Sequence, residues 1–286
     1  MAITNLENST IKLVDLDTKE NSIYIMENKY TEEIVLNRGL IGLEFANACY
    51  NGSKLFISHF ADELNDIDDI AELMLLSKGF YYRLFDAYTD VLKKNIQINF
   101  LATKRVMNEN IANIEVRYSD ISAKASTLII GDTIATGNSI VAALEHYEKT
   151  CKIKRLFIFS FCGSKVGALK IIDYCKKSNI KLTIVYGIAA FGFGDNGFDL
   201  PFLHEDTITD EKYIEKAKKV YENLPICAVG VDFASQTQSL KKYGNLCSLE
   251  RNFWGVGDEV FPYYDDDIDE DLVRKERNAF KKYSNK

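Results

Sequence analysis

Residues 127–139 read Thr-Leu-Ile-Ile-Gly-Asp-Thr-Ile-Ala-Thr-Gly-Asn-Ser. The run 127–130 is apolar or β-branched and does not alternate with polar residues, so it predicts a strand covered on both faces, as in the middle of a parallel sheet. Asp132 comes at the carboxyl end of this strand, where open α/β sheets bind their ligands. A turn rich in hydroxyls and glycine then leads into a helix predicted over residues 140–147. The stretch therefore predicts an α/β fold with a ligand site after the strand.

The turn after this strand has the chemistry of a phosphate site. A helix start leaves backbone N–H groups without intrahelical partners, Thr136 and Ser139 add hydroxyl donors, and Gly137 lets the main chain approach a ligand closely. The turn lacks the lysine of Gly-x-x-x-x-Gly-Lys-Ser/Thr and the spacing of Gly-x-Gly-x-x-Gly, so it indicates neither a triphosphate nor a dinucleotide. It favours a phosphate monoester. The alternative is an ordinary strand, Thr-Gly turn and helix of any α/β protein.

The same stretch resembles the phosphoribosyl pyrophosphate (PRPP) signature of the type I phosphoribosyltransferases. That signature is a hydrophobic strand, two acidic positions, two apolar positions and Ala/Thr-Thr-Gly-x-Ser/Thr. The resemblance implies that Asp132 is a catalytic residue that holds ribose hydroxyls and, through the ribose or water, Mg²⁺. The residues implied to bind the ribose and 5′-phosphate are Asp132, Thr133, Ala135, Thr136, Gly137, Asn138 and Ser139. Gly131 stands where the family usually has its first acid, so one carboxylate contact to the ribose is missing.

Residues 33–46 resemble the pyrophosphate loop of the same family. They predict a short strand over 34–36, a turn, and a helix from residue 41. Arg38 in this turn has a planar fork that can bind two phosphate oxygens, which implies a catalytic role on the leaving group. The residues implied to bind pyrophosphate are Asn37, Arg38, Gly39, Lys104 and Arg105. The alternatives are an exposed arginine in an ordinary turn and, for the last two, a solvated basic turn.

The glycine-rich stretch 187–199 follows a strand predicted over 182–186 and is the candidate for binding a base. Glycines beside aromatic residues let main-chain groups reach a planar ligand while a ring stacks on it. The candidates are Phe191, Phe193, Gly194 and Asp195. Residues 192–197 bear a weaker likeness to uracil phosphoribosyltransferases, which favours a pyrimidine without deciding it. A plain surface loop is the alternative.

The composition bounds the function classes. A chain of 286 residues with 47% hydrophobic residues can bury a full core. The net charge of −7 argues against a broad surface for nucleic acid or anionic membranes. No apolar run approaches a membrane span, and the first residues do not read as an export signal. Six scattered cysteines without a Cys-x-x-Cys pair indicate reduced thiols in a cytoplasmic protein.

The order of apolar runs predicts a Rossmann-like, mostly parallel sheet flanked by helices, which is the type I phosphoribosyltransferase fold that the motif implies. The predicted strands are 34–36, 55–58, 96–102, 128–130, 156–161 and 182–186, and the predicted helices are 41–49, 70–94, 140–147 and 167–177. Residues 1–199 form the predicted core, with a helical insertion over 62–94. Residues 200–286 form a predicted C-terminal extension, which could act as a hood over the acceptor site.

The resemblance implies a transferase that uses PRPP and Mg²⁺ to ribosylate a nucleobase or related nitrogen acceptor and releases pyrophosphate. Its partners are then small molecules, with a homodimer as the general expectation for a soluble enzyme. Ala135 stands where some purine enzymes of the family place an Asp, so the acceptor stays open. Two alternatives remain. One is a non-catalytic protein of the same fold that senses PRPP or a nucleotide, and the other is an enzyme that cleaves a nucleoside or nucleotide.

Overall fold

The computed structural model describes residues 3–6, 9–14, 21–37, 40, 42–76, 78–108, 111–194 and 200–221. One sheet runs through this part of the chain in the order β1-β2-β3-β10-β8-β7-β4-β5-β6. Its strands are β1 (Ile3–Leu6), β2 (Ser9–Val14), β3 (Ser22–Glu27), β4 (Ile70–Leu76), β5 (Gln97–Asn108), β6 (Ile111–Asp120), β7 (Thr127–Gly131), β8 (Arg155–Ser160) and β10 (Lys181–Tyr186). Pairing is parallel from β3 to β5 and antiparallel at both edges.

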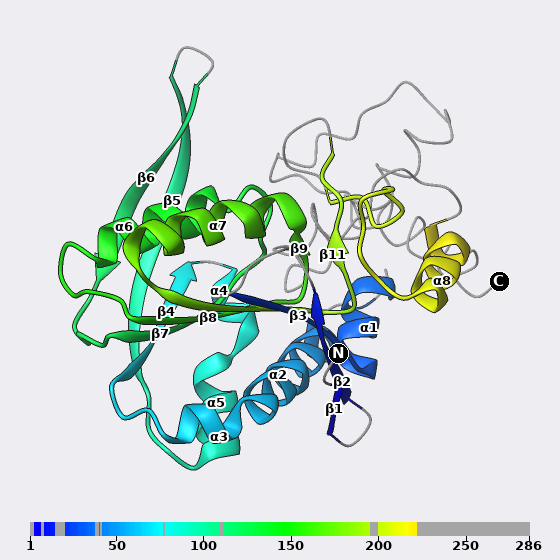
Figure 1. Cartoon of the computed structure of the whole chain (residues 1–286), viewed down its shortest axis with the longest axis horizontal. Coiled ribbons are helices and arrows are strands. Elements are labelled where there is room, and N and C mark those ends of the chain that lie inside the picture. Colours follow the sequence, from blue (N-terminus) through cyan, green and yellow to red (C-terminus); the bar gives the residue numbers. More distant parts are fainter. Residues whose placement is uncertain are drawn as a thin grey trace, which may run out of the picture.

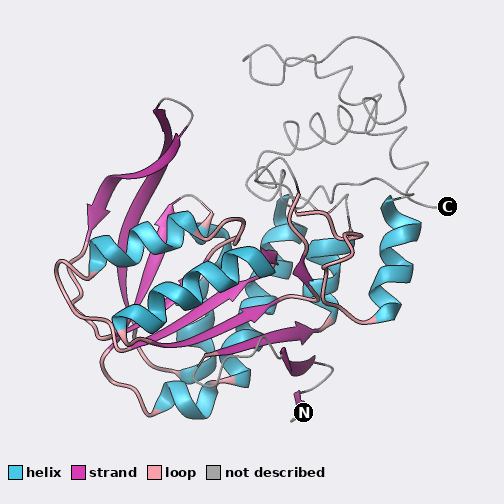
Figure 2. Cartoon of the chain, turned by 45° about the horizontal axis from the view of Figure 1, so that its top comes forward, coloured by secondary structure: helices cyan, strands magenta, loops and turns pink. Residues whose placement is uncertain are grey.

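Helices cover both faces of this sheet (Figure 1). On one face lie α1 (Lys29–Leu36), α2 (Gly42–His59), α3 (Ala61–Asn65), α4 (Gly79–Tyr82) and α5 (Leu84–Leu92), and on the other lie α6 (Asn138–Tyr147) and α7 (Lys165–Ser178). The last described helix, α8 (Glu211–Tyr221), lies beside α1. Figure 2 shows the same layers from a second direction. The predicted class, a mostly parallel sheet flanked by helices, is confirmed.

The central strand β7 shows why the sequence could predict this class. All five of its residues are buried. Leu128 and Ile130 pack in the core beneath α6 and α7, whereas Ile129 packs in the core on the opposite face. Because both faces need apolar side chains, the run is continuous rather than alternating. A short parallel pair, β9 (Gly163–Ser164) with β11 (Ala190–Phe191), stands apart from the main sheet.

The strands predicted at 34–36 and 55–58 are wrong, because both segments are helical. Helix α1 begins at a capping box in which the Asn28 side chain accepts the Thr31 N–H while the Thr31 hydroxyl accepts the Asn28 N–H. Thr31, Ile34 and Val35 then face the core at helical spacing. Residues 55–58 lie inside α2, whose buried Phe56 and Ile57 continue a helical stripe.

The helix predicted over 70–94 is also wrong in its first part. Residues 70–76 form β4, a strand between β7 and β5, and helix resumes only at α4 and α5. Six of the seven residues of β4 are buried. One of them is Glu72, whose charge made the run look like an amphipathic helix. The segment 62–94 is therefore not a helical insertion, because it supplies a strand of the central sheet. The boundary at residue 199 stays a prediction, and residues 222–286 of the extension lie outside the described residues.

Strands β5 and β6 form a long hairpin at one end of the sheet. Residues 96–102 were predicted as a strand, but β5 continues to Asn108 and pairs with β6 along its length, with a shift in register between Ala102 and Thr103. Figure 1 shows the two strands rising as a ribbon beyond the rest of the sheet. No helix among the described residues has the length and apolar character needed to cross a membrane.

Candidate functional site

A cavity lies at the carboxyl end of the sheet, beside the neighbouring strands β4 and β7. The chain leaves β4 toward α4 on one face and leaves β7 toward α6 on the other face. Such a switch of direction opens a crevice at the carboxyl ends of parallel strands, which is where α/β sheets bind ligands. The cavity has a volume of about 310 Å³.

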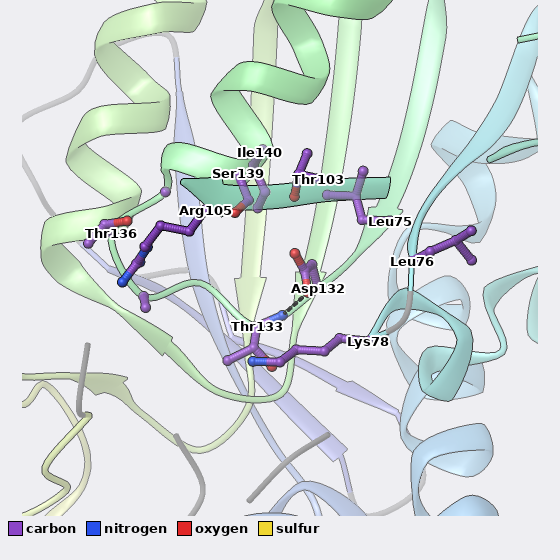
Figure 3. A pocket seen from close by; sticks show the side chains of 12 residues that line it. Leu75, Leu76, Lys78, Thr103, Arg105, Asp132, Thr133, Thr136, Ser139 and Ile140 are labelled. Carbon is purple, nitrogen blue, oxygen red and sulfur yellow. Dashed lines mark hydrogen bonds between the residues drawn. The ribbon is translucent and has the colours of Figure 1, made fainter. Parts of the chain in front are cut away.

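Three segments that are distant in sequence line this cavity (Figure 3). The end of β4, strand β5 and the β7–α6 turn each contribute. The lining residues are Leu75, Leu76, Lys78, Thr103, Arg105, Asp132, Thr133, Ala135, Thr136, Gly137, Ser139 and Ile140. Six of the seven residues predicted to bind ribose and 5′-phosphate are among them. The exception is Asn138, whose amide oxygen is bonded by the Lys170 side chain of α7.

Asp132 is the carboxylate of the cavity, and it is only 8% exposed. Burial raises its pKa to about 6, although the Lys78 charge and a backbone hydrogen bond oppose the rise. That hydrogen bond runs from the Thr133 N–H to Asp132 Oδ1 over 2.8 Å. At neutral pH the side chain is mostly ionised and can accept hydrogen bonds from a ligand, whereas near pH 6 it is half protonated.

The turn before α6 is shaped by close backbone packing. Gly137 has a φ of 76° and precedes the helix, and no side chain caps the helix start. A β-carbon on Gly137 would lie 2.7 Å from the Gly167 carbonyl oxygen of α7, so both the left-handed conformation and the lack of space require glycine. The first-turn N–H groups of α6 and the hydroxyls of Thr136 and Ser139 therefore meet at the cavity.

Lys78 is a lining residue that sequence reasoning missed. It lies between the end of β4 at Leu76 and the start of α4, so it stands at the same sheet edge as Asp132. Its charge acts on the Asp132 carboxyl. Gly79 after it approaches β7 closely, because an added β-carbon would be 3.0 Å from the Gly131 carbonyl oxygen. The sequence signal was an apolar run followed by Lys-Gly, but the run was taken for part of a helix.

Arg105 and Lys104 lie on opposite faces of β5. Both side chains are exposed, but Arg105 lines the cavity together with Thr103, two residues before it, whereas Lys104 does not line it. The reason is that successive side chains on a strand point to opposite faces. Sequence reasoning offered both cations as pyrophosphate ligands, with a solvated turn as the alternative, and the strand brings one of them, Arg105, to the cavity.

The other predicted pyrophosphate residues lie elsewhere or outside the described residues. Asn37 ends α1, where its N–H bonds the Glu33 carbonyl, and it is not among the residues that line the cavity. Arg38 and Gly39 lie outside the described residues. Their loop joins two helices, α1 and α2, rather than a strand and a helix. Their binding roles stay predictions.

The described candidates for base binding, Phe191, Phe193 and Gly194, do not line the cavity. Phe191 is fully buried and packs edge-on against Phe202, with ring centroids 5.3 Å apart. Phe193 packs partly buried against the same core, and Gly194 is partly exposed. Asp195 lies outside the described residues. Their contact with a base stays a prediction.

The donor set around Asp132 fits an indirect role toward Mg²⁺. Within the described part of the chain, no three His, Cys, Asp or Glu side chains are grouped to hold a metal ion. Mg²⁺ commonly keeps several waters and binds substrate phosphates with one or two carboxylates, so a single carboxylate beside a phosphate turn is compatible with it. Asp132 would hold a water or a hydroxyl of the metal complex.

Comparison with solved structures finds distant likenesses, several of them to phosphoribosyltransferases. The chain is similar to the AQ2163 protein from Aquifex aeolicus, at 16% identity over 61% of this chain and 91% of that chain with a TM-score of 0.45. It is similar to orotate phosphoribosyltransferase from Mycobacterium tuberculosis, at 16% identity over 49% of this chain and 73% of that chain with a TM-score of 0.33. It is also similar to a hypoxanthine-guanine phosphoribosyltransferase from Bacillus anthracis, at 13% identity over 52% of this chain and 80% of that chain with a TM-score of 0.35. No family model and no curated protein matches the chain.

Proposed function

We propose that this protein is a phosphoribosyltransferase that uses PRPP and Mg²⁺ to ribosylate a nucleobase or related nitrogen acceptor. One observation carries the proposal. A single cavity faces a glycine-hydroxyl turn at a helix start, a buried carboxylate, and two cations from separate segments. A phosphate monoester, a sugar diol and a pyrophosphate need these three kinds of group, and the motif at residues 127–139 resembles the PRPP signature.

The positions of these groups suggest how the donor would lie. The 5′-phosphate would accept hydrogen bonds from the α6 start and from Thr136 and Ser139. Asp132 would accept a ribose hydroxyl. Lys78 and Arg105 would then take up charge on the pyrophosphate as its bond to C1 breaks and the acceptor nitrogen bonds to C1. A bound Mg²⁺ would supply further neutralisation of the leaving group.

Gly131 favours a second candidate, a non-catalytic sensor of PRPP or a nucleotide. The position that usually holds an acid in the motif has no side chain, so the ribose has fewer charged contacts than the signature provides. Weaker orientation of the sugar is compatible with binding while it disfavours turnover. A transferase needs an acceptor site, to which residues 200–286 would contribute, whereas a sensor does not.

The proposal is tested by incubating the purified chain with PRPP, Mg²⁺ and a panel of nucleobases. Pyrophosphate release that depends on a base supports transfer, and binding of PRPP without turnover supports the sensor. Release of free base from a nucleotide would support cleavage instead. A chain that does not bind PRPP contradicts the proposal.

Arg105 and Lys104 offer a matched pair of variants for this assay. We expect Arg105→Ala to lower PRPP affinity or turnover roughly 10- to 100-fold, because a charged hydrogen bond to phosphate contributes about 1.5–3 kcal/mol. Lys104→Ala removes a neighbouring charge from the other face of β5 and should change the same quantities less than about 3-fold. Equal effects of the two variants would argue against a contact between Arg105 and the donor.

A further inference from the structure

Gly131, next to Asp132, is packed directly beneath the ring of Tyr82. A β-carbon on Gly131 would lie 2.5 Å from Tyr82 Cγ and 2.6 Å from Tyr82 Cβ. These separations are far below van der Waals contact. No side chain, and in particular no carboxylate, can therefore occupy position 131 unless Tyr82 moves.

Tyr82 is held in place from several directions. Its ring is fully buried and stacks on Phe161, with centroids 4.6 Å apart and an interplanar angle of 10°. Its hydroxyl oxygen accepts the Phe161 N–H at 3.1 Å, and its carbonyl oxygen accepts the Ser53 hydroxyl at 2.6 Å. Moving the ring would break this packing, so position 131 is closed to an acid by the fold of α4 against β7.

Asp132 is consequently the only carboxylate among the described residues that line the cavity. Its Oδ1 already accepts the Thr133 N–H. Its Oδ2 accepts no hydrogen bond from the described part of the chain and is the oxygen left for a ligand. Oδ2, with both of its lone pairs free, is the stronger acceptor for one hydroxyl, whereas a second, neighbouring ribose hydroxyl would have to share this oxygen or compete with the Thr133 N–H at Oδ1.

The remaining polar groups of the cavity are poor substitutes for a second carboxylate. The Thr133 hydroxyl oxygen is itself buried. Lys78 and Arg105 are cations that pair more strongly with phosphate than with a neutral hydroxyl. The Thr103 hydroxyl on β5 is a neutral group, so a hydrogen bond from it would be worth less than one to a carboxylate.

We infer that this pocket binds one of the two neighbouring hydroxyls at C2 and C3 of a 5-phosphopentose strongly through Asp132 and gives the other no carboxylate oxygen of its own. The pocket therefore accepts a 5-phosphopentose that lacks the second hydroxyl nearly as well as ribose 5-phosphate. This inference rests on the proposed function, since it assumes that the phosphate turn binds a pentose phosphate. Tyr82 acts in it as a positioning residue that determines specificity by closing position 131.

The test is the affinity of the full chain for ribose 5-phosphate, 2-deoxyribose 5-phosphate and 3-deoxyribose 5-phosphate, measured by calorimetry at pH 7.5. We expect one deoxy sugar to bind within about 3-fold of ribose 5-phosphate. The other should bind roughly 10- to 100-fold more weakly, since it lacks the hydroxyl that bonds the carboxylate. In Asp132→Asn the difference between the two deoxy sugars should shrink to about 3-fold or less, and in Thr103→Val it should persist.

The outcomes separate this inference from the proposed function. If both deoxy sugars bind 10-fold more weakly than ribose 5-phosphate, or if neither is weakened, the inference is overturned while the phosphate site stands. Loss of the discrimination in Thr103→Val would assign the hydroxyl contact to Thr103 and also overturn it. If ribose 5-phosphate does not bind at all, the proposed function fails and the inference fails with it.

Discussion

The Asp132 carboxyl links ligand binding to the stability of the empty protein. Burial raises its pKa from 3.8 to about 6, so its ionised form is less favourable in the folded chain than in the unfolded chain. Because the folded pKa is the higher one, stability falls as pH rises from about 4 to about 6, and the full cost is present above that range. The ionised Asp132 carboxylate is therefore expected to lower the folding stability of the empty protein while it provides an acceptor for a ligand.

We predict that Asp132→Asn stabilises the empty protein by about 1–3 kcal/mol at pH 7.5, since the asparagine can still accept the Thr133 N–H without carrying a charge. The same variant should bind ribose 5-phosphate roughly 10- to 100-fold more weakly, because it loses one charged hydrogen bond. Urea unfolding and calorimetry measure the two effects. Asp69 is the contrasting control, because hydrogen bonds from Ser126 lower the pKa of its carboxyl, so Asp69→Asn should be destabilising or neutral. A destabilised Asp132→Asn would refute this account.

The carboxyl of Glu72 on β4 is also buried, and its titration should be visible in the pH dependence of the unfolding free energy. Glu72 is fully buried, and burial raises its pKa to about 8, with a further rise from the Asp86 charge; neither of its carboxylate oxygens has a hydrogen-bond partner among the described residues. Because the folded pKa is again the higher one, the unfolding free energy of the wild type should fall as pH rises through 6.5 to 8, where Asp132 no longer titrates.

We predict that Glu72→Gln removes most of this pH dependence, because the amide keeps the shape of the side chain without a proton to lose. The measurement is urea unfolding at pH 6.5, 7.2 and 8. The wild-type curve should slope downward and the variant curve should be nearly flat. Parallel curves would show that Glu72 does not titrate in this range.

At the scale of elements, the sequence was most informative where a run can only be a strand buried on both faces. Strand β7 has only apolar or β-branched residues before its final glycine, and the turn after it combines glycine with hydroxyls, so the strand and the residues that line the cavity from Asp132 to Ser139 could be predicted together. Residues 34–36 and 70–76 show the limit. A short apolar run is compatible with a strand or a buried helix, and only the tertiary partners decide between them.

Helix α7 packs against the β7–α6 turn at Gly167. A β-carbon there would lie 2.5 Å from both the Ala135 carbonyl oxygen and Ile134 Cγ2. Alanine usually favours a helix interior over glycine. Here the added methyl group would push on the turn, and overpacking of this kind costs about 1–3 kcal/mol.

We predict that Gly167→Ala weakens ribose 5-phosphate binding roughly 10-fold or more and lowers stability, although it raises helix propensity. Val166→Ala, at a half-exposed neighbouring position on α7, is the control and should leave binding within about 2-fold. Calorimetry and thermal unfolding check both variants. Unchanged binding in Gly167→Ala would mean that the turn can shift without affecting its ligand.

At the scale of the whole molecule, the site is assembled from parts that the sequence does not place together. Lys78 and Asp132 follow β4 and β7, and Arg105 lies on β5, so they meet only because β4 lies between β7 and β5 in the sheet. Without β4 the sequence could not place Lys78 beside the β7–α6 turn. The chemistry of a residue can be read locally, whereas the position of Lys78 at the cavity depends on sheet order.

Ion pairs around Glu27 help to hold α8 against the edge of the sheet. Glu27 on β3 is 6% exposed and pairs with Lys12 at 2.6 Å and with Lys212 of α8 at 2.5 Å. Lys12 also reaches Asp210, just before α8, at 2.5 Å. Charge pairs that shield a buried carboxylate contribute more than exposed pairs, because removing one partner leaves the charge poorly compensated.

We predict that Lys12→Met lowers the unfolding free energy by about 1–2 kcal/mol and loosens α8, because it removes a cation shared by Glu27 and Asp210. Lys216→Met, which breaks the more exposed pair of α8 with Glu32, should cost less than about 0.5 kcal/mol. Urea unfolding gives the stabilities, and hydrogen exchange of the α8 amides reports the docking of the helix. If the two variants are equal in stability and exchange, Lys12 does not tie α8 to β2 and β3. If only Lys12→Met accelerates exchange, the N-terminal strands and residues 210–221 form one cooperative unit that is anchored away from the ligand cavity.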